Sequence, residues 1–306
     1  MNRPPLRAES AKWNAADYAA NSAVQQSWAR ELITRLNLRG DERVLDVGCG
    51  DGKVTAELAN AVPRGFVVGI DASAEMIGFA RKAFSARKFP NLKFQICDAR
   101  KIKPETITSN AGHRTPNIEP MGIARTRTIS AFDVRCSMFD VVFSNAALHW
   151  VDDHQAILRG MASVLKSGGR LIVSCGGKGN AQEVFVILRP ELRSKHWGKF
   201  FRKMPRPYFF YAPEDYEKWL PKAGFKIKVL KLVPKDATYA GADGFAAWLR
   251  TTWLPYVQRV PENLREEFIT AVTRHYLAKH PPDAEGKVHV RMVRLEIDAQ
   301  KVTSDG

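Results

Sequence analysis

The chain has 306 residues, of which 45% are hydrophobic, so it can bury a full core in one large domain or in one domain with a cap. No apolar run approaches the roughly 20 residues of a membrane span, and the N-terminus lacks the apolar centre of a signal peptide, so we expect a soluble cytoplasmic protein. The net charge of +15 favours an anionic substrate or partner, or serves solubility. The 4 cysteines lack C-x-x-C spacing and the 7 histidines lack metal spacing, so we expect reduced thiols and no metal site.

Apolar strands and helical patterns alternate along the first part of the chain. Buried strands are expected over 43–49, 65–73, 92–99, 138–151 and 170–175, the fourth of which runs into a loop. Helices are expected over 24–38, 53–62, 74–84 and 156–169. Strands that are apolar throughout and alternate with helices predict a parallel sheet that is covered on both faces.

Two segments depart from this alternation. Residues 98–139 are polar, hold several Thr and Arg residues and show no clean period, so we expect an irregular insertion at about 102–135. Towards the C-terminus, strands are expected over 225–234 and 288–299, with a largely helical segment at about 236–285 between them. If these two strands pair in the same sheet, the helices form a cap over one end of it.

The stretch "RVLDVGCGDGKVTAELA", residues 43–59, predicts a strand, a glycine turn and a helix. Such a turn binds a ligand at the carboxyl edge of the strand, where missing Cβ atoms let backbone N–H groups approach closely. The dinucleotide fingerprint has the spacing G-x-G-x-x-G, whereas this turn has G-x-G-x-G after Asp46. A carboxylate there would repel a pyrophosphate, but it suits a ligand that carries an ammonium or sulfonium group.

The motif "VLDVGCGDG" resembles the first motif of class I S-adenosylmethionine-dependent methyltransferases. The second strand ends in "VGID", the third in "CDA" and the fourth begins "FDVVFSN", which extends the resemblance. It implies a doubly wound, mostly parallel, seven-stranded Rossmann-like sheet with a helical cap before the last strand. We expect an N-terminal helical segment over 1–39 that closes over the cofactor, a core over 40–176, and the remaining strands with the cap over 177–306.

The resemblance also implies roles for the residues of the first two strands. Gly48 and Gly50 would line the methionine end and the ribose of S-adenosylmethionine, and Asp46 would orient the turn and the cofactor's amino group. Asp71, with Ala72 beside it, would accept hydrogen bonds from both ribose hydroxyls. Alternatively, Asp71 is the N-cap of the next helix, a role that its neighbour at position 73 could fill equally well.

The adenine of the cofactor would lie against residues that follow the second and third strands. Met76 would pack on the ring, although its spacing alone predicts a core residue, and Asp98 and Ala99 would meet the amino edge. Asn145 and Ala146 follow the fourth strand, where the cofactor's methyl end is expected. The sequence "SNAA" is neither N-P-P-F nor D-P-P-Y, which argues against N-methylation of adenine or cytosine.

The segments "WNAADYAANSAVQQSWA" and "FSNAALHWVDDHQAIL" resemble small-molecule methyltransferases of the trans-aconitate methyltransferase type. In such proteins a Tyr and a Gln seven residues later close over the cofactor, and Tyr18 and Gln25 have that spacing. The insertion after Ala99 is a departure, because this connection is usually much shorter in the family. These relatives methylate carboxylates, which are already ionised at neutral pH and need no general base.

Aromatic walls and a few cations would then suffice to align the acceptor. We expect His149 and Trp150 on the substrate side, where His149 is a wall or hydrogen-bond donor, or alternatively a base for a hydroxyl substrate. The cap candidates are Trp248, Arg250, Trp253 and Tyr256. We expect one of the two tryptophans to face the substrate and the other to pack, because five residues separate them. Arg291 and Arg294 are expected to point to solvent or to pair with acids.

Two other functions remain open. The stretch over 193–206 holds seven basic residues counting its histidine, with interleaved aromatics and no acid, which is also typical of RNA-binding sites; alternatively, the aromatics point inward from a solvated face. An RNA methyltransferase is therefore one alternative. A catalytically silent cofactor-binding protein is the other. We expect a small anionic substrate as the partner. We expect neither membrane association nor a nucleic-acid partner.

Overall fold

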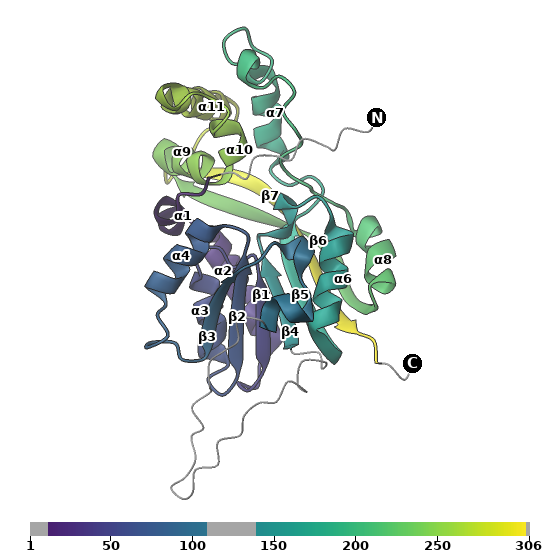
Figure 1. Ribbon diagram of the computed structural model, residues 1–306. Helices are drawn as coiled ribbons and strands as arrows, with labels where there is room; N and C mark the ends of the chain where they lie inside the picture. The colour runs from purple at the N-terminus through teal and green to yellow at the C-terminus, as the bar shows by residue number, and fades with distance from the viewer. Residues whose placement is uncertain (1–11, 109–138, 304–306) are drawn as a thin grey trace, which may run out of the picture.

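The computed structural model describes residues 12–108 and 139–303. Its centre is a seven-stranded sheet of order β3-β2-β1-β4-β5-β7-β6 (Figure 1). The strands are β1 (Arg43–Val47), β2 (Phe66–Asp71), β3 (Leu92–Ile96), β4 (Phe139–Asn145), β5 (Leu165–Gly176), β6 (Phe225–Ala240) and β7 (Lys287–Lys301). β7 runs antiparallel to both of its neighbours, and the other pairs are parallel. The predicted mostly parallel, seven-stranded α/β sheet is confirmed.

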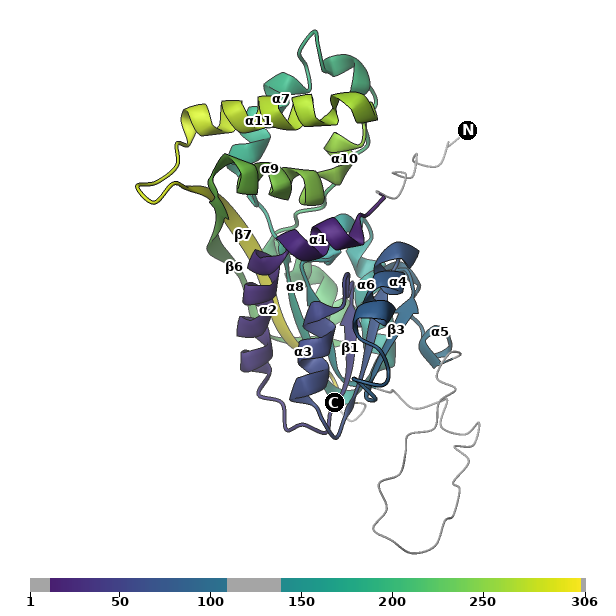
Figure 2. The same ribbon diagram turned by 90° about the vertical axis from the view of Figure 1, so that its left-hand side faces the viewer.

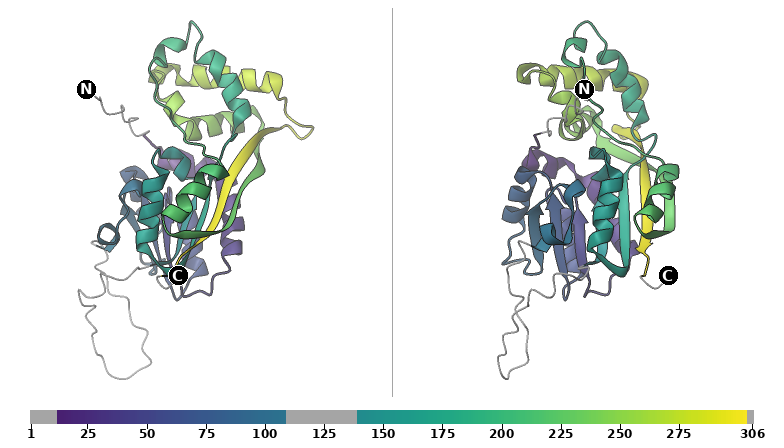
Figure 3. Two further views of the ribbon diagram at one scale, coloured as in Figure 1. Left: turned by 90° about the vertical axis from the view of Figure 1, so that its right-hand side faces the viewer. Right: turned by 45° about the vertical axis from the view of Figure 1, so that its right-hand side comes forward.

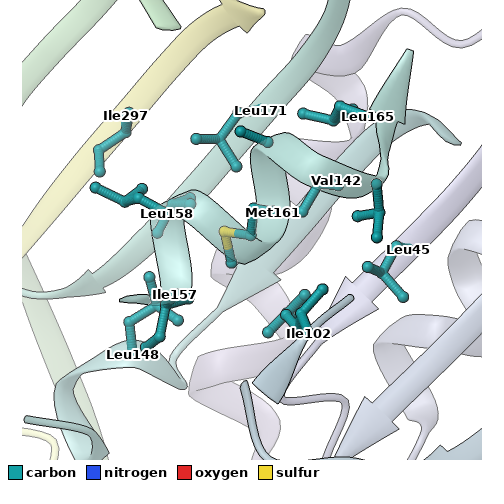
Figure 4. Close-up of a cluster of buried hydrophobic side chains, with 14 of the residues drawn as sticks. Leu45, Ile102, Val142, Leu148, Ile157, Leu158, Met161, Leu165, Leu171 and Ile297 are labelled. Atoms are coloured by element: carbon teal, nitrogen blue, oxygen red, sulfur yellow. The ribbon is translucent and has the colours of Figure 1, made fainter. Parts of the chain in front are cut away.

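Helices cover both faces of the sheet. One layer contains α2 (Ala23–Leu36), α3 (Lys53–Ala61) and α4 (Ala74–Ala83), whose apolar side chains share a cluster with Val44, Val67 and Phe143 of the sheet. The other layer contains α5 (Pro104–Thr108), α6 (His154–Val164) and α8 (Pro213–Lys222). In the close-up of this second layer, side chains of α6 lie over those of β1, β4 and β5 (Figure 4).

The helix α6 illustrates how local signals set its bounds. The Asp153 side chain accepts a hydrogen bond from the Ala156 N–H and so caps the N-terminus. The predicted helix over 156–169 is too long, because Leu165 is extended and already pairs with Phe139 of β4. Strand pairing therefore determines the conformation from Leu165 onwards, although the spacing of these residues is helical.

A cap of helices stands on a two-stranded arm. β7 pairs with β5 only from Gly176↔Arg294 to Arg170↔Gln300, whereas its pairing with β6 continues to Ala240↔Lys287. This outer half of the β6–β7 ribbon reaches up to the cap (Figure 3). The helices between the two strands are α9 (Gly241–Thr252), α10 (Leu254–Val257) and α11 (Arg265–Lys279). α7 (Gln182–Glu191), which follows β5, joins them in one apolar cluster.

The N-terminal helices α1 (Ala15–Asn21) and α2 connect the cap to the glycine turn. α1 lies between α9 of the cap and the helical layer that contains α3 and α4 (Figure 2). The Lys53 ammonium donates to the Ala19 carbonyl oxygen, and the Arg250 guanidinium pairs with Asp17 at 3.2 Å. The end of α1 is thus attached to α3, and its start is attached to the cap.

Parts of the earlier expectations lie outside the described residues. The insertion predicted at about 102–135 begins inside them, where α5 forms just after the 3-10 helix η1 (Ala99–Lys101), but its residues 109–135 fall outside. The cysteines at 49, 97 and 175 are free thiols, and Cys136 is not among the described residues. Within the described ranges, no helix has the length and apolar character needed to cross a membrane.

Candidate active site

The three glycines of the turn have different structural roles. All adopt positive φ, namely 77° at Gly48, 54° at Gly50 and 84° at Gly52. A Cβ on Gly48 would lie 2.1 Å from the Ala147 Cβ, and one on Gly52 would lie 2.8 Å from the Phe94 ring. A Cβ on Gly50 would meet only the edge of the Tyr18 ring, at 4.0 Å. Close packing therefore requires Gly48 and Gly52, while Gly50 leaves space beneath Tyr18.

The carboxylate of Asp71, at the end of β2, bridges the glycine turn and α4. Its oxygens accept hydrogen bonds from the N–H groups of Gly50 at 3.0 Å and Ser73 at 2.8 Å. Burial raises the pKa of Asp71, and the N–H donors of Ser73, Gly50 and Ala72 partly offset that increase. The Ser73 side chain, rather than Asp71, caps α4 by accepting from the Met76 N–H. The carboxylate is therefore available to a ligand through its remaining lone pairs.

Two further acids lie near the turn. Asp46 is buried and accepts a hydrogen bond from the Thr55 hydroxyl at 2.8 Å, and burial raises its pKa to about 7. Asp51 accepts from the Lys53 N–H at 3.2 Å and lies 3.5 Å from the Ser22 hydroxyl. Because Asp46 keeps its proton up to about pH 7 and Asp51 pairs with the Lys53 ammonium at 3.6 Å, neither acid carries a full, uncompensated charge at the turn.

A pocket lies between the sheet and the cap, at the carboxyl ends of β4 and β5. The N-terminal segment contributes Trp13, Tyr18, Gln25 and Trp28. The loop after β4 contributes Ala146, His149 and Trp150. The segments flanking α7 contribute Asn180, Ala181, Tyr208 and Phe210. The floor and roof come from Met292 and Arg294 of β7 and from Trp248, Thr252 and Trp253 of α9 and its C-cap.

One residue that lines this pocket has an unpaired acceptor. The Gln25 Oε1 atom is buried and has no hydrogen-bond partner among the described residues. Buried polar atoms of this kind are rare and indicate a missing partner. Tyr18 packs edge-on against Trp13 with ring centroids 5.3 Å apart, and burial, together with the charges of Asp51 and Asp71, raises its pKa. Its hydroxyl therefore stays protonated and can donate.

His149 is a neutral imidazole in the pocket wall. Its Nδ1 accepts a hydrogen bond from the Gly176 N–H at 3.3 Å, so the proton resides on Nε2. Burial, reinforced by the charge of Arg294, lowers the pKa of His149 to about 3. Trp150 packs edge-on against Trp13 and Tyr208, with centroids 5.0 Å apart in both pairs. The two side chains thus form an aromatic wall with two N–H donors, Nε2 of His149 and Nε1 of Trp150.

Arg294 is a buried cation, which contradicts the expectation that it would point to solvent or pair with an acid. It is 4% exposed. Its Nε donates to the Ser174 hydroxyl at 3.1 Å, and its Nη2 donates to Asn145 Oδ1 at 3.1 Å and to the Ser174 carbonyl oxygen at 2.6 Å. The guanidinium also lies over the Trp28 ring at 5.4 Å. Within the described residues, Nη1 has no hydrogen-bond partner, so two N–H donors remain for a ligand. Arg291 behaves as expected and pairs with Glu183 at 2.9 Å.

Comparisons with known proteins agree with this architecture. Residues 38–201, more than half of the chain, match the family described as a methyltransferase domain. The chain belongs to this methyltransferase family. An uncharacterised methyltransferase of Schizosaccharomyces pombe is 31% identical over 294 residues, which cover 94% of this chain and 98% of that protein. Trans-aconitate 2-methyltransferase of Rhodopseudomonas palustris is 26% identical over 295 residues, which cover 93% and 97%.

The fold of this methyltransferase also recurs among solved structures. The YcgJ protein of Bacillus subtilis has a TM-score of 0.54 at 17% identity, covering 90% of this chain and 98% of that one. The chain is a class I S-adenosylmethionine-dependent methyltransferase, as the glycine motif predicted, and S-adenosylmethionine is its cofactor. The residues present fit that cofactor, because the buried Gln25 Oε1 lacks a partner among the described residues and the Asp71 carboxylate keeps free lone pairs at the glycine turn.

The methyltransferase structure brings many of the predicted site residues together. Tyr18, Gln25, Ala146, His149 and Trp150 line the pocket. The Asn145 amide donates to the Gln25 carbonyl oxygen at 3.0 Å, which connects the loop after β4 to α2. Both cap tryptophans line the pocket, so Trp248 and Trp253 do not divide into one that faces it and one that packs elsewhere.

Other predicted residues lie outside that pocket. Arg250 pairs with Asp17, and Tyr256 packs inside the cap against Trp253 with centroids 5.7 Å apart. On the adenine side, Met76 is buried in α4 and Ala99 packs against the core. Asp98 pairs with Arg100 at 2.7 Å, and that hydrogen-bonded guanidinium lowers its pKa. Asp98 therefore already has a protein partner, and its predicted contact with the adenine stays a prediction.

Proposed function

We propose that this methyltransferase transfers a methyl group to the carboxylate of a small acid, and that Arg294 holds that carboxylate. The observation that carries the proposal is the buried guanidinium of Arg294, which lines the pocket with Nη1 unpaired among the described residues. Since Nε and Nη2 already donate to Ser174 and Asn145, Nη1 is left to bind a carboxylate oxygen by a charge-assisted hydrogen bond. The match to trans-aconitate 2-methyltransferase, a protein named for an acid, supports the same chemistry.

The cofactor would lie with its methionine end at the pocket and its nucleoside over the turn. Gln25 Oε1 would accept from the amino group, and the Tyr18 ring would cover the space above Gly50. The Asp71 carboxylate, already fixed by two backbone N–H groups, would accept from the ribose hydroxyls. The roles proposed from the sequence for Asp46, Gly48, Met76, Asp98 and Ala99 stay predictions.

This reaction requires the protein mainly to align the acceptor carboxylate with the methyl group. When bound, the cofactor would supply an electrophilic sulfonium methyl, from which a carboxylate oxygen would displace the sulfur together with the C–S electron pair. The acceptor is ionised at neutral pH, so no residue has to remove a proton. Arg294 orients the acceptor, His149 donates Nε2–H without charge, and Trp13 and Trp150 exclude water from the pocket.

The experiment compares two arginines of the same strand. Arg294→Gln should lower kcat/KM for acids by about 30-fold or more, since truncating one partner of a buried charge pair costs about 2–5 kcal/mol. Arg291→Gln is the matched control, because Arg291 lies three residues earlier on β7 with a side chain that is 72% exposed, and it should stay near wild type. Products are identified as base-labile methyl esters made from labelled S-adenosylmethionine. If Arg294→Gln instead weakens S-adenosylhomocysteine binding to the same degree, the arginine binds the cofactor's own carboxylate and the proposal is wrong.

RNA methylation is the second candidate, because the segment over 193–206 carries an excess of cations. Its Trp197 and Phe201 are buried in the cap, so they cannot stack on bases as they stand. RNA binding that weakens steeply with salt, together with methyl transfer to RNA, would favour this candidate over the acid. The cytoplasmic location expected from the sequence stays a prediction.

A further inference from the structure

The charges of the pocket limit which acid can bind there. Among the described residues that line it, Arg294 is the one charged side chain, since His149 is neutral. A single guanidinium can compensate one carboxylate. A second or third carboxylate would lose its water without gaining a cation, and burying an uncompensated charge is strongly unfavourable. The pocket is therefore poorly suited to a tricarboxylate.

The rest of the wall is aromatic. The Trp28 ring lies against the Arg294 guanidinium, and the Trp150 ring lies against the His149 imidazole. Tyr208 and Phe210 stack in parallel with ring centroids 5.7 Å apart. Such a wall gains free energy by covering apolar surface rather than by solvating charge. The acceptor that fits combines one carboxylate with an apolar body.

A second cavity lies inside the cap, beyond the end of the pocket. It is bounded by Leu188 of α7, Leu249 of α9 and the α11 side chains Phe268, Ile269 and Val272. All of these side chains are apolar and nearly fully buried. This cavity is small, about 10 Å³, so it holds no ligand group while Trp253 is in place, but its largely apolar walls would favour an apolar group if the indole were removed.

Trp253 stands between the two spaces. Among the described residues that line them, Trp253 is the one shared by both. It occupies the junction where α9 ends and α10 begins, and its ring packs edge-on against Phe185 at 4.9 Å, Trp248 at 5.7 Å and Tyr208 at 5.6 Å. The indole thus closes the pocket towards the cap cavity.

We propose that the acceptor is a monocarboxylic acid with an apolar tail, and that Trp253 sets the length of tail that the enzyme accepts. This inference rests on the proposed carboxylate methylation and narrows it to one class of acid. The carboxylate is held by Arg294, the body lies along the aromatic wall, and the tail ends against the indole. Removal of the indole joins the pocket to the cap cavity and admits longer tails.

The test measures kcat/KM for ester formation with the full-length enzyme on unbranched monocarboxylic acids of increasing length, and on trans-aconitate and citrate. Wild type should methylate the monoacids up to a length limit and should prefer them to the tricarboxylates. Trp253→Ala should raise the kcat/KM ratio of a longer to a shorter acid by about 10-fold or more, since one methylene in an apolar pocket is worth at least that much. Trp253→Phe, which keeps a smaller ring in place, should raise the same kcat/KM ratio by a smaller factor. It replaces the alanine variant in this test if that variant folds poorly.

Trp219→Ala is the control. Trp219 belongs to α8, its ring centroid lies 4.8 Å from that of Tyr211, and it packs against the core between the sheet and the layer of α6 and α8, so it lines neither cavity. It should leave the chain-length profile unchanged. Preference for tricarboxylates would overturn the inference while leaving carboxylate methylation intact. A profile that both Trp253 variants leave unchanged would overturn the role of the indole. Absence of ester from every acid would instead refute the proposed function itself.

Discussion

Replacing Gly48 with alanine tests whether the glycine turn and the loop after β4 form one packed unit. The φ of 77° lies in the left-handed region, which costs an L-residue about 1–2 kcal/mol. The added Cβ would lie 2.1 Å from the Ala147 Cβ, an overlap that forces a shift worth about 1–3 kcal/mol more. Gly48→Ala should therefore lower the free energy of unfolding by about 2–5 kcal/mol. The displaced loop carries Ala146 and His149, so acid methylation should fall as well.

The assay is urea denaturation at equilibrium, with Gly78→Ala as the matched control. Gly78 lies inside α4, where an added Cβ has no atom of the structure within 4 Å. Alanine in a helix interior is favoured over glycine by about 0.5–1 kcal/mol, so this variant should be as stable as wild type or slightly more stable. If Gly48→Ala unfolds at the same urea concentration as Gly78→Ala, the contact with Ala147 does not hold the turn in place and the reasoning fails.

Three further predictions concern single side chains. Since burial raises the pKa of Asp46 to about 7 from 3.8, the folded protein keeps a proton that the unfolded chain loses, and its free energy of unfolding should fall by up to about 4 kcal/mol between about pH 4 and 7. Asp46→Asn should lack this decline in urea titrations without cofactor; equal slopes for the two proteins would contradict it. Because the pKa of His149 is lowered to about 3, kcat/KM for acids should be flat from about pH 6 to 8, and an inflection that His149→Gln removes would indicate a base instead. Asp71→Asn should weaken S-adenosylhomocysteine binding in calorimetry by at least about 10-fold, given about 1.5–3 kcal/mol for hydrogen bonds to charged groups; an unchanged affinity would remove Asp71 from the cofactor site.

The sheet could be predicted because its signals are local. Each parallel strand is an apolar run that ends in a turn signal, and each helix has its own spacing and cap, as Ser73 and Asp153 show. The end of α6 could not be predicted in this way, because the extended conformation of Leu165 depends on pairing with Phe139, which lies 26 residues earlier. The packing of α7 with α11 likewise depends on tertiary contacts that have no local signature.

The cofactor motif was visible in the sequence, whereas the substrate side was visible only in part. Tyr18 and Gln25 were found by resemblance, but Arg294 was missed although a signal for it exists. Val290 and Met292 are buried in β7, and a strand places every second residue on the same face, so Arg294 shares their buried face. Arg250 shows the reverse case, because its pairing with Asp17 depends on how α1 lies against the cap, which no spacing in the sequence records.

The central claim is that Arg294 binds the carboxylate to be methylated. A crystal structure of the enzyme with S-adenosylhomocysteine and a monocarboxylic acid tests it most directly. We expect a carboxylate oxygen of the acid within about 3 Å of Arg294 Nη1, with the tail directed towards Trp253. An acid bound elsewhere in the pocket, or Nη1 bonded to the carboxylate of S-adenosylhomocysteine instead, would contradict the account.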